Sequence, residues 1–322
     1  MQDLEVTIVG GIMYSKMLKK EIEKLIELEK LDCSVEEFST KVDWERISCK
    51  YQLSESFMEK HWKDLDKDWI SVYQKLSESF IEKHWEDLDK VCISKYQKLS
   101  ESFIEKHWED LDKVCISEYQ KLSEPFMDKH WKDLNKECIS EYQKLSESFI
   151  EKHWKDLDKY WISKYQKLSE PFMDKYWKDL DKVCISEYQK LSESFIQKHN
   201  LTIDEDNWLY KDYNFKLDYI KNNTSYEIVD DSIIAYKSVR SDNYSIFNFQ
   251  YLYEVGKIYE SHCDCTKEEN SFGLSAWTKK DALEYYDKGK LLKVKIKIND
   301  IGRIVHNNGK IRCFRFEVLE EV

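Results

Sequence analysis

A short segment near the C-terminal end, "HCDC", holds side chains that bind zinc or carry out redox chemistry. It contains His262, Cys263 and Cys265, and Cys313 lies far downstream. Thiolates and imidazoles are the usual zinc ligands, normally in pairs separated by two or more residues. Here the cysteines are closer than that, and no second close pair exists. We therefore expect ordinary loop and strand cysteines, with a zinc site or a redox-sensitive Cys263–Cys265 pair as alternatives.

Histidines recur at a fixed spacing, in a column that Tyr176 interrupts. The column consists of His61, His84, His107, His130 and His153. Packed helices lie about 8–10 Å apart, whereas zinc needs nitrogen ligands at about 2.0–2.1 Å, so neighbouring histidines cannot share an ion. We expect half-buried rings beside tryptophans. The alternative is a ladder on a binding surface, with the candidates His84, His107, His130, His153, Trp85 and Trp108.

A third recurring position carries cysteine in some units and tryptophan in others. It holds Cys92, Cys115, Cys138 and Cys184, but also Trp69 and Trp161. A position that accepts both a small thiol and a large indole is defined by packing with variable volume. We expect a structural role for these cysteines.

These columns belong to an internal repeat marked by a tyrosine. The tyrosines are Tyr51, Tyr73, Tyr96, Tyr119, Tyr142, Tyr165 and Tyr188. The first step is 22 residues and the next five are 23, and the short step comes from "YQLSES", which lacks the lysine of "YQKLSES". Such a fixed period is typical of repeat proteins, in which each unit buries its apolar face on its neighbours.

Each unit predicts two short helices. The first starts at Ser77, a favourable N-cap, and extends through "ESFIEKHWEDL", and the second starts near Asp89 and extends through "KVCISKYQKL". Each has apolar residues at i, i+4 and i+7, which is one helical face. Pro125 and Pro171 fall in the first turn, where proline is tolerated. Because helices of about ten residues are marginal alone in water, we expect stacked hairpins, an α-solenoid.

Beyond the repeats the pattern becomes that of strands. "SIIAYKSV", "KLLKVKIKI" and "IRCFRFEVL" have strand-like composition, and "TKKDALEYY" predicts a short helix with Thr278 as N-cap. The predicted fold class is an all-α solenoid of ~23-residue two-helix repeats followed by a small α+β domain. The predicted boundaries are an N-terminal cap (1–40), the repeat array (41–198), a capping helix and connector (199–231) and the α+β domain (232–322).

Composition narrows the classes of partner. The 322 residues carry a net charge of −12, which argues against a general nucleic-acid or membrane-surface binder. No apolar run approaches the roughly 20 residues that span a bilayer, and the acidic start does not resemble a secretory signal. Nine cysteines without a pairing pattern favour a reducing, cytoplasmic setting. Nothing in the sequence predicts a cofactor.

Two stretches resemble known protein families. "KVDWERISCKYQLSESFMEKH" (41–61) resembles the helical repeats of many giant-virus proteins, also found in some phage and bacterial proteins, although later units depart from its "VDW". "AYKSVRSDNYSIFNFQYLYEVGKIYESHCDC" and "NSFGLSAWTKKDALEYY" resemble a C-terminal module of giant-virus repeat proteins. The resemblance implies a virus- or phage-encoded protein acting in host cytoplasm, and no enzymatic activity for the array.

The C-terminal module also resembles, more loosely, the layout of ADP-ribosyltransferases. That layout implies Lys237 or Arg240 as the base that holds NAD phosphates, Ser275 on a strand before a helix, and Glu317 as the group that steadies the ribose. The chain departs from it because the family's Ser-Thr-Ser signature reads "LSAW" here. A shared fold does not fix an activity.

The sequence therefore predicts a non-catalytic protein–protein interaction scaffold that binds a host protein, for example a defence protein. The first alternative is an ADP-ribosyltransferase-like or NAD-binding effector. The second is an acidic decoy of a nucleic-acid-binding protein, whose binding would weaken steeply with salt.

Overall fold

The structure, a computed structural model, describes residues 6–9, 12–246, 251–268, 271–286 and 289–322. The chain divides into two compact units, Met1–Asp112 and Lys113–Val322. The expected order, a run of short regular helices followed by a domain built on an antiparallel sheet, is confirmed.

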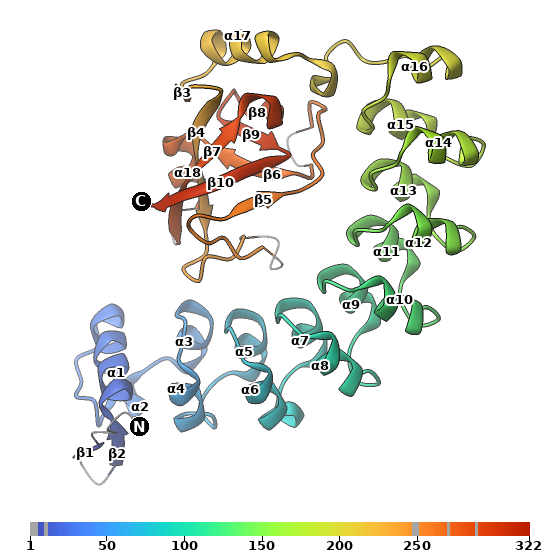
Figure 1. The fold of residues 1–322 in the computed structure, drawn as a ribbon. Helices are drawn as coiled ribbons and strands as arrows, with labels where there is room; N and C mark the ends of the chain where they lie inside the picture. Colours follow the sequence, from blue (N-terminus) through green and yellow to red (C-terminus); the bar gives the residue numbers. More distant parts are fainter. Residues whose placement is uncertain (1–5, 10–11, 247–250, 269–270, 287–288) are drawn as a thin grey trace. The chain divides into compact units, whose positions relative to one another are not determined.

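The first unit contains a hairpin, one longer helix and the first repeats. Its elements are β1 (Val6–Val9), β2 (Ile12–Ser15), α1 (Lys16–Glu29), α2 (Phe38–Lys41), α3 (Trp44–Lys50), α4 (Glu55–Lys60), α5 (Lys67–Tyr73), α6 (Glu78–Lys83), the 3₁₀ turn η1 (Trp85–Asp87), α7 (Lys90–Tyr96) and α8 (Glu101–Lys106). Figure 1 shows α3, α5 and α7 in one row and α4, α6 and α8 in another. We call the first row the A helices and the second the B helices.

The second unit continues this alternation and then forms a sheet. Its helices are α9 (Lys113–Tyr119), α10 (Glu124–Lys129), α11 (Lys136–Tyr142), α12 (Glu147–Lys152), α13 (Lys159–Tyr165), α14 (Glu170–Tyr176), α15 (Lys182–Tyr188), α16 (Glu193–His199), η2 (Trp208–Tyr210), α17 (Tyr213–Asn223), α18 (Lys279–Tyr285) and η3 (Ile298–Asp300). Its strands are β3 (Glu227–Val229), β4 (Ser232–Val239), β5 (Ile258–Glu260), β6 (Leu274–Trp277), β7 (Lys290–Lys297), β8 (Ile301–Val305), β9 (Lys310–Cys313) and β10 (Arg315–Glu321). The odd-numbered helices α9–α15 are A helices and the even-numbered α10–α16 are B helices.

Side-chain caps define where the repeat helices begin. Ser77 Oγ accepts the backbone N–H of Phe80 at the start of α6 (3.2 Å), and Asp89 Oδ1 accepts that of Cys92 at the start of α7 (2.6 Å). Both starts agree with the sequence prediction. The B helices end sooner than expected, however, because α6 stops at Lys83 and a tight turn follows.

A buried glutamine joins each A helix to the preceding repeat. In the second unit Gln166 Nε2 donates to the carbonyls of Ser140 (3.0 Å) and Gln143 (2.8 Å), and its Oε1 accepts the N–H of Leu145 (3.0 Å). The same three bonds are made by Gln74, Gln97, Gln143 and Gln189. Each glutamine thus satisfies the backbone groups left at a helix end one repeat away.

A buried serine makes a second link between repeats. Ser140 Oγ donates to the carbonyl of Lys136 (2.7 Å) in its own helix and accepts the N–H of Asp158 (2.9 Å), which caps the next A helix. Because a helix of seven residues keeps few internal hydrogen bonds, these links supply the partners that the helix itself lacks.

The structure corrects the explanation of the short first step. Helices α3 and α5 start at Trp44 and Lys67, so the 23-residue period holds here too. Gln74 bonds to the carbonyl of Tyr51 as Gln97 bonds to that of Gln74. Tyr51 therefore occupies the glutamine position, and no lysine has been lost from the repeat.

Each unit closes its own end of the repeats with residues outside the pattern. In the first, Glu29 of α1 pairs with Arg46 (2.7 Å) and Lys50 (2.7 Å). Burial opposes ionisation of Glu29, but hydrogen bonds from Lys50, Tyr51 and Arg46 lower its pKa to about 2. In the second, the Tyr210 hydroxyl donates to the carbonyl of Gln189 (2.9 Å) and accepts the N–H of Leu191 (3.3 Å). Tyr210 thus replaces the next glutamine.

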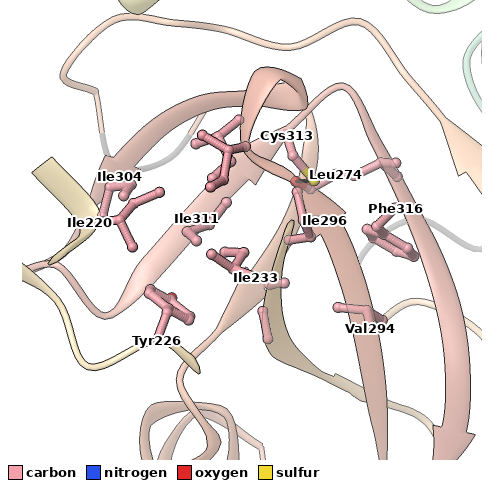
Figure 2. Close-up of a cluster of buried hydrophobic side chains, with 14 of the residues drawn as sticks. Ile220, Tyr226, Ile233, Leu274, Val294, Ile296, Ile304, Ile311, Cys313 and Phe316 are labelled. Atoms are coloured by element: carbon pink, nitrogen blue, oxygen red, sulfur yellow. Dashed lines mark hydrogen bonds between the residues drawn. The ribbon is translucent and has the colours of Figure 1, made fainter. Parts of the chain in front are cut away.

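The sheet has the strand order β5-β10-β7-β4-β6-β9-β8, with β3 paired to β4, and all its pairs are antiparallel. One face carries the main core, which includes Ile233, Val294, Ile296 and Ile311 (Figure 2). The core also takes in Trp208, Ile220 and Tyr226, which precede Ser232. Helix α18 covers the other face, where Trp277, Ala282 and Leu291 are buried.

The segment 311–319 is two strands and not one. Strand β9 ends at Cys313 and pairs with β6 and β8, whereas β10 begins at Arg315 and pairs with β5 and β7. An apolar run of this kind does not reveal a change of partner strand. The predicted helix at Thr278 is present, because the Thr278 hydroxyl accepts the N–H of Asp281 (3.2 Å).

We expect Gln166→Ala to lower the free energy of unfolding by about 2–4 kcal/mol, because it leaves one buried N–H and two carbonyls without this partner. The neighbouring exposed substitution Lys167→Ala should change it by less than about 0.5 kcal/mol. Urea unfolding followed by circular dichroism measures both. Equal effects of the two substitutions would show that the glutamine ladder does not hold the repeats together.

Candidate functional site

The histidine column lies between successive B helices and is used in packing. The ring of His107 lies 4.0 Å from that of Trp85 and 4.6 Å from that of Phe103, centroid to centroid. Its Nε2 lies 2.7 Å from Glu82, which also pairs with Lys106 (2.6 Å). The His107 side chain is only 10% exposed. A histidine sandwiched in this way contributes to stacking and presents little surface to a partner.

The other members of the column have equivalent surroundings, each within its own compact unit. His84 pairs with Glu59, and His153 pairs with Asp128 and stacks on Trp131, whereas His130 stacks on Phe126. Tyr176 continues the column by donating to Glu151 (2.9 Å), and His199, which the sequence reading left out, pairs with Asp174 (2.6 Å). The spacing of 23 from Tyr176 would have revealed His199. Trp85 and Trp108 are buried.

The first histidine differs because no repeat precedes it. His61 is 5% exposed and is surrounded by the rings of Phe38, Trp44 and Phe57. Its Nε2 has no hydrogen-bond partner among the described residues. Burial lowers the pKa of His61, so this ring stays neutral near pH 7.

The recurring cysteines are poor nucleophiles. Burial raises the pKa of Cys92 and Cys138 to about 11 and that of Cys184 to about 12. Because the thiolate is the reactive form, these positions offer packing volume and not redox chemistry.

The A helices carry the exposed aromatic side chains of the repeats. In each of the two compact units, we define the tyrosine face as the side of its A helices formed by the repeat tyrosines from Tyr73 onward and the residue four positions earlier. On it Trp69 is 36%, Tyr73 42% and Tyr142 49% exposed. Near α13 and α15 this face is covered, since Phe272 lies 4.3 Å from Tyr165 and 5.9 Å from Tyr188.

The "HCDC" segment lies in the stretch that covers α13 and α15. Cys263 and Cys265 are buried, and a side chain at Gly302 would collide with Cys263 Sγ and lie 3.3 Å from Cys265 Sγ. Cys313 lies on β9 and donates to the carbonyl of Leu274 (3.4 Å). His262 stacks on Phe272 (5.1 Å). Among the described residues, no group of three His, Cys, Asp or Glu side chains is arranged to hold a metal ion.

A buried ion pair fixes this segment to the sheet. Asp264 and Arg312 of β9 are both 0% exposed, and their charged groups lie 3.6 Å apart. Arg312 also donates to the carbonyl of Thr266. Breaking a buried pair by removing one partner is costly, so the pair holds the segment firmly in place.

The residues of the ADP-ribosyltransferase layout are divided between the two faces of the sheet. Lys237 points into the main core, where its Nζ donates to the carbonyl of Ser275 (2.9 Å) and lies 5.0 Å from the Tyr253 ring centre. Glu317 pairs in register with Lys295 while Phe316 and Val318 on either side are buried. Its side chain is therefore on the face opposite to Lys237.

Of the other two residues of that layout, Ser275 is also on the face opposite to Lys237, and Arg240 lies beyond the end of its strand. Ser275 lies between Leu274 and Ala276, which face the main core, so its side chain is on the opposite face. Arg240 follows β4 and pairs with Asp242 (3.2 Å).

No family model, curated protein or solved structure matches the chain. In the part of the chain that the structure describes, no helix has the length and apolar character needed to cross a membrane.

We expect Lys237→Met to stabilise the protein at pH 7. Burial lowers the pKa of Lys237 from 10.5 to about 8, so the charged form costs up to about 3 kcal/mol in the folded state. Between these values the unfolded chain binds the extra proton, so the wild type gains stability as pH rises. The advantage of Lys237→Met should therefore shrink from pH 8 to 10. Destabilisation at every pH would contradict this role, and urea unfolding measures it.

We expect Asp128→Asn to destabilise the protein at neutral pH but not in acid. Hydrogen bonds from Lys152 and His153 lower the pKa of Asp128 from its usual 3.8. Its contribution is thus present above pH 3.8 and lost as pH falls through the lower folded value. Urea midpoints from pH 7 to 3 should converge for the two proteins. The exposed Glu205→Gln is the control, and a difference independent of pH would refute the charge-based explanation.

Proposed function

We propose that the chain is a non-catalytic scaffold for protein–protein interaction, in which the repeats form an α-solenoid and the tyrosine face is the binding surface. One observation carries the proposal. The histidines and tryptophans of the column pack between repeats, whereas Trp69, Tyr73 and Tyr142 are exposed on the A helices. Aromatic side chains on a rigid framework are the residues that most often anchor protein partners.

The framework supports this use because its rigidity does not depend on the exposed side chains. The ladders of Gln74, Gln97 and Ser71 are buried and bond to backbone groups. Residues on the tyrosine face can therefore vary from repeat to repeat without loss of the fold. A preorganised surface loses little side-chain freedom when a partner binds.

The resemblance to giant-virus repeat proteins supports a host protein as the partner and host cytoplasm as the place of action. A host defence factor is the partner that we propose.

The geometry favours the scaffold over the two alternatives. Lys237 and Glu317 lie on opposite faces of the sheet, which speaks against an NAD site that uses both, and Arg240, the other candidate base, is paired with Asp242. An acidic decoy needs uncompensated negative charge, whereas Glu82, Asp128 and Asp174 each pair with a lysine of the next repeat.

Affinity capture from nuclease-treated host lysate tests the proposal with three full-length baits. They are the wild type, the tyrosine-face variant Trp69→Ala/Tyr73→Ala/Tyr142→Ala, and the control Ile258→Ala/Leu283→Ala, which removes exposed side chains of the sheet domain. We expect one specific protein to be retained by the wild type and the control and lost by the tyrosine-face variant. Retention by that variant together with loss by the control would overturn the proposal.

A further inference from the structure

The chain itself shows which chemistry the tyrosine face accepts. We define the docking segment as residues 261–268 and 271–273, which lie against α13 and α15 in the second unit. Phe272 packs on Tyr165 and Tyr188 at 4.3 and 5.9 Å between ring centres. The ring of His262 stacks on Phe272 and is hydrogen-bonded to the backbone of Lys164. An aromatic side chain is thus the centre of this contact.

Charge surrounds that aromatic contact on both sides. Lys164 Nζ lies 5.4 Å from the ring centre of Tyr165 and 5.1 Å from that of Tyr188. The docking segment brings Asp264 and Glu268 close to the same tyrosines, where burial and then these carboxylates raise the pKa of Tyr188. The segment therefore sets an aromatic side chain against the tyrosines beside Lys164, and of its two carboxylates Asp264 is buried against Arg312 while Glu268 is exposed.

The first unit carries a closely similar aromatic pair. On α13 the rings of Trp161 and Tyr165 lie 5.3 Å apart, and on α5 those of Trp69 and Tyr73 lie 5.4 Å apart. From α5 onward, only α5 and α13 carry tryptophan at this position, and the other A helices carry cysteine. Trp69 and Tyr73 are 36% and 42% exposed.

The residue of α5 that corresponds to Lys164 is Val72, so the lysine nearest in position to this pair is on the next A helix. Lys95 on α7 precedes its repeat tyrosine as Lys164 does on α13, and it lies 5.2 Å from the ring centre of Tyr96. The A helices α5 and α7 pack directly against each other. The first unit thus offers an indole, a phenol and an ammonium group on neighbouring helices.

We propose that the Trp69–Tyr73 part of the tyrosine face, together with Lys95, binds a segment of a partner protein that carries an aromatic side chain flanked by acidic residues. This rests on the proposed function and names the chemistry of its partner. The aromatic side chain packs on the Trp69–Tyr73 pair, which supplies apolar area and edge or stacking contacts. The acidic residues meet the ammonium group of Lys95, which steers association and sets the salt dependence.

The occupant is a separate protein and not a second copy of this chain. A second copy also carries the docking segment, but there Asp264 is fully buried against Arg312 and Phe272 lies on its own α13 and α15. Releasing it would leave a buried arginine without its partner, which is costly.

A synthetic peptide with the sequence of residues 261–273, its two cysteines replaced by serine, is the probe. Fluorescence anisotropy with the full-length protein measures its binding. We expect saturable binding below about 1 mM, weakened at least about tenfold by Trp69→Ala or Tyr73→Ala. The matched control Val91→Ala, an exposed residue of α7, should bind as the wild type does. A peptide with alanine in place of its phenylalanine should not bind.

A second variant identifies where the peptide binds. Phe272→Ala removes the aromatic side chain of the intramolecular contact, while the buried Asp264–Arg312 pair keeps the rest of the docking segment in place, so one peptide per chain should still bind. If binding appears only in Phe272→Ala and ignores Trp69→Ala, only α13 and α15 accept this chemistry and the proposal is overturned. Absence of binding to every variant, or equal binding by the wild type and Trp69→Ala, also overturns it. Circular dichroism of each variant confirms that it is folded.

The two proposals fail separately. If host protein capture depends on the tyrosine face while the peptide does not bind, the scaffold proposal stands and the proposed partner chemistry is wrong. If the peptide binds through Trp69 but no host protein depends on that face, the surface accepts this chemistry and the scaffold proposal fails.

Discussion

The whole repeat region depends on one constraint, the need to satisfy the backbone groups at the ends of very short helices. A helix leaves about four N–H and four C=O groups without internal partners at its ends, and the repeat helices have only six or seven residues. The buried side chains of Gln97 and Ser71 meet this need across repeats. A single repeat therefore lacks partners for its own backbone, and its neighbours are part of its structure.

This constraint explains which positions can vary. The glutamine and serine of the A helices and the serine caps of the B helices bond to backbone, so their identity is fixed by geometry. Other positions, such as that of Trp69 and Cys92 and that of Lys95 and Glu118, differ from one repeat to the next. Differences between repeats also occur elsewhere, for example at Ile81 and Met127 and at Ser79 and Pro125.

The sheet domain is joined to the repeats of the second compact unit by the residues that satisfy the backbone groups of the last repeat. Tyr210 completes the glutamine ladder, and Trp208 two residues before it enters the sheet core. Arg303 of β8 lies 5.4 Å from the Trp208 ring centre. One short stretch thus caps the repeats and begins the next domain, so the connector is a structural joint. Lys237 also has a structural role, since its aliphatic stem packs in the core and its amine donates to the carbonyl of Ser275.

The sequence by itself determined the features that local chemistry controls. The repeat period, the helix starts at Ser77 and Asp89, the helix at Thr278 and the strand at Ser232–Val239 all follow from caps and alternation within a few residues. Contacts between residues distant in sequence depend on the tertiary structure. Examples in the repeats are the pairing of His107 with Glu82 and the presence of Tyr51 at the glutamine position. Examples in the sheet domain are the opposite faces of Lys237 and Glu317 and the packing of Phe272 on Tyr165. Local patterns cannot reveal these, because a side chain's partner is fixed by the register of packed elements, and that register is set only when the whole core forms.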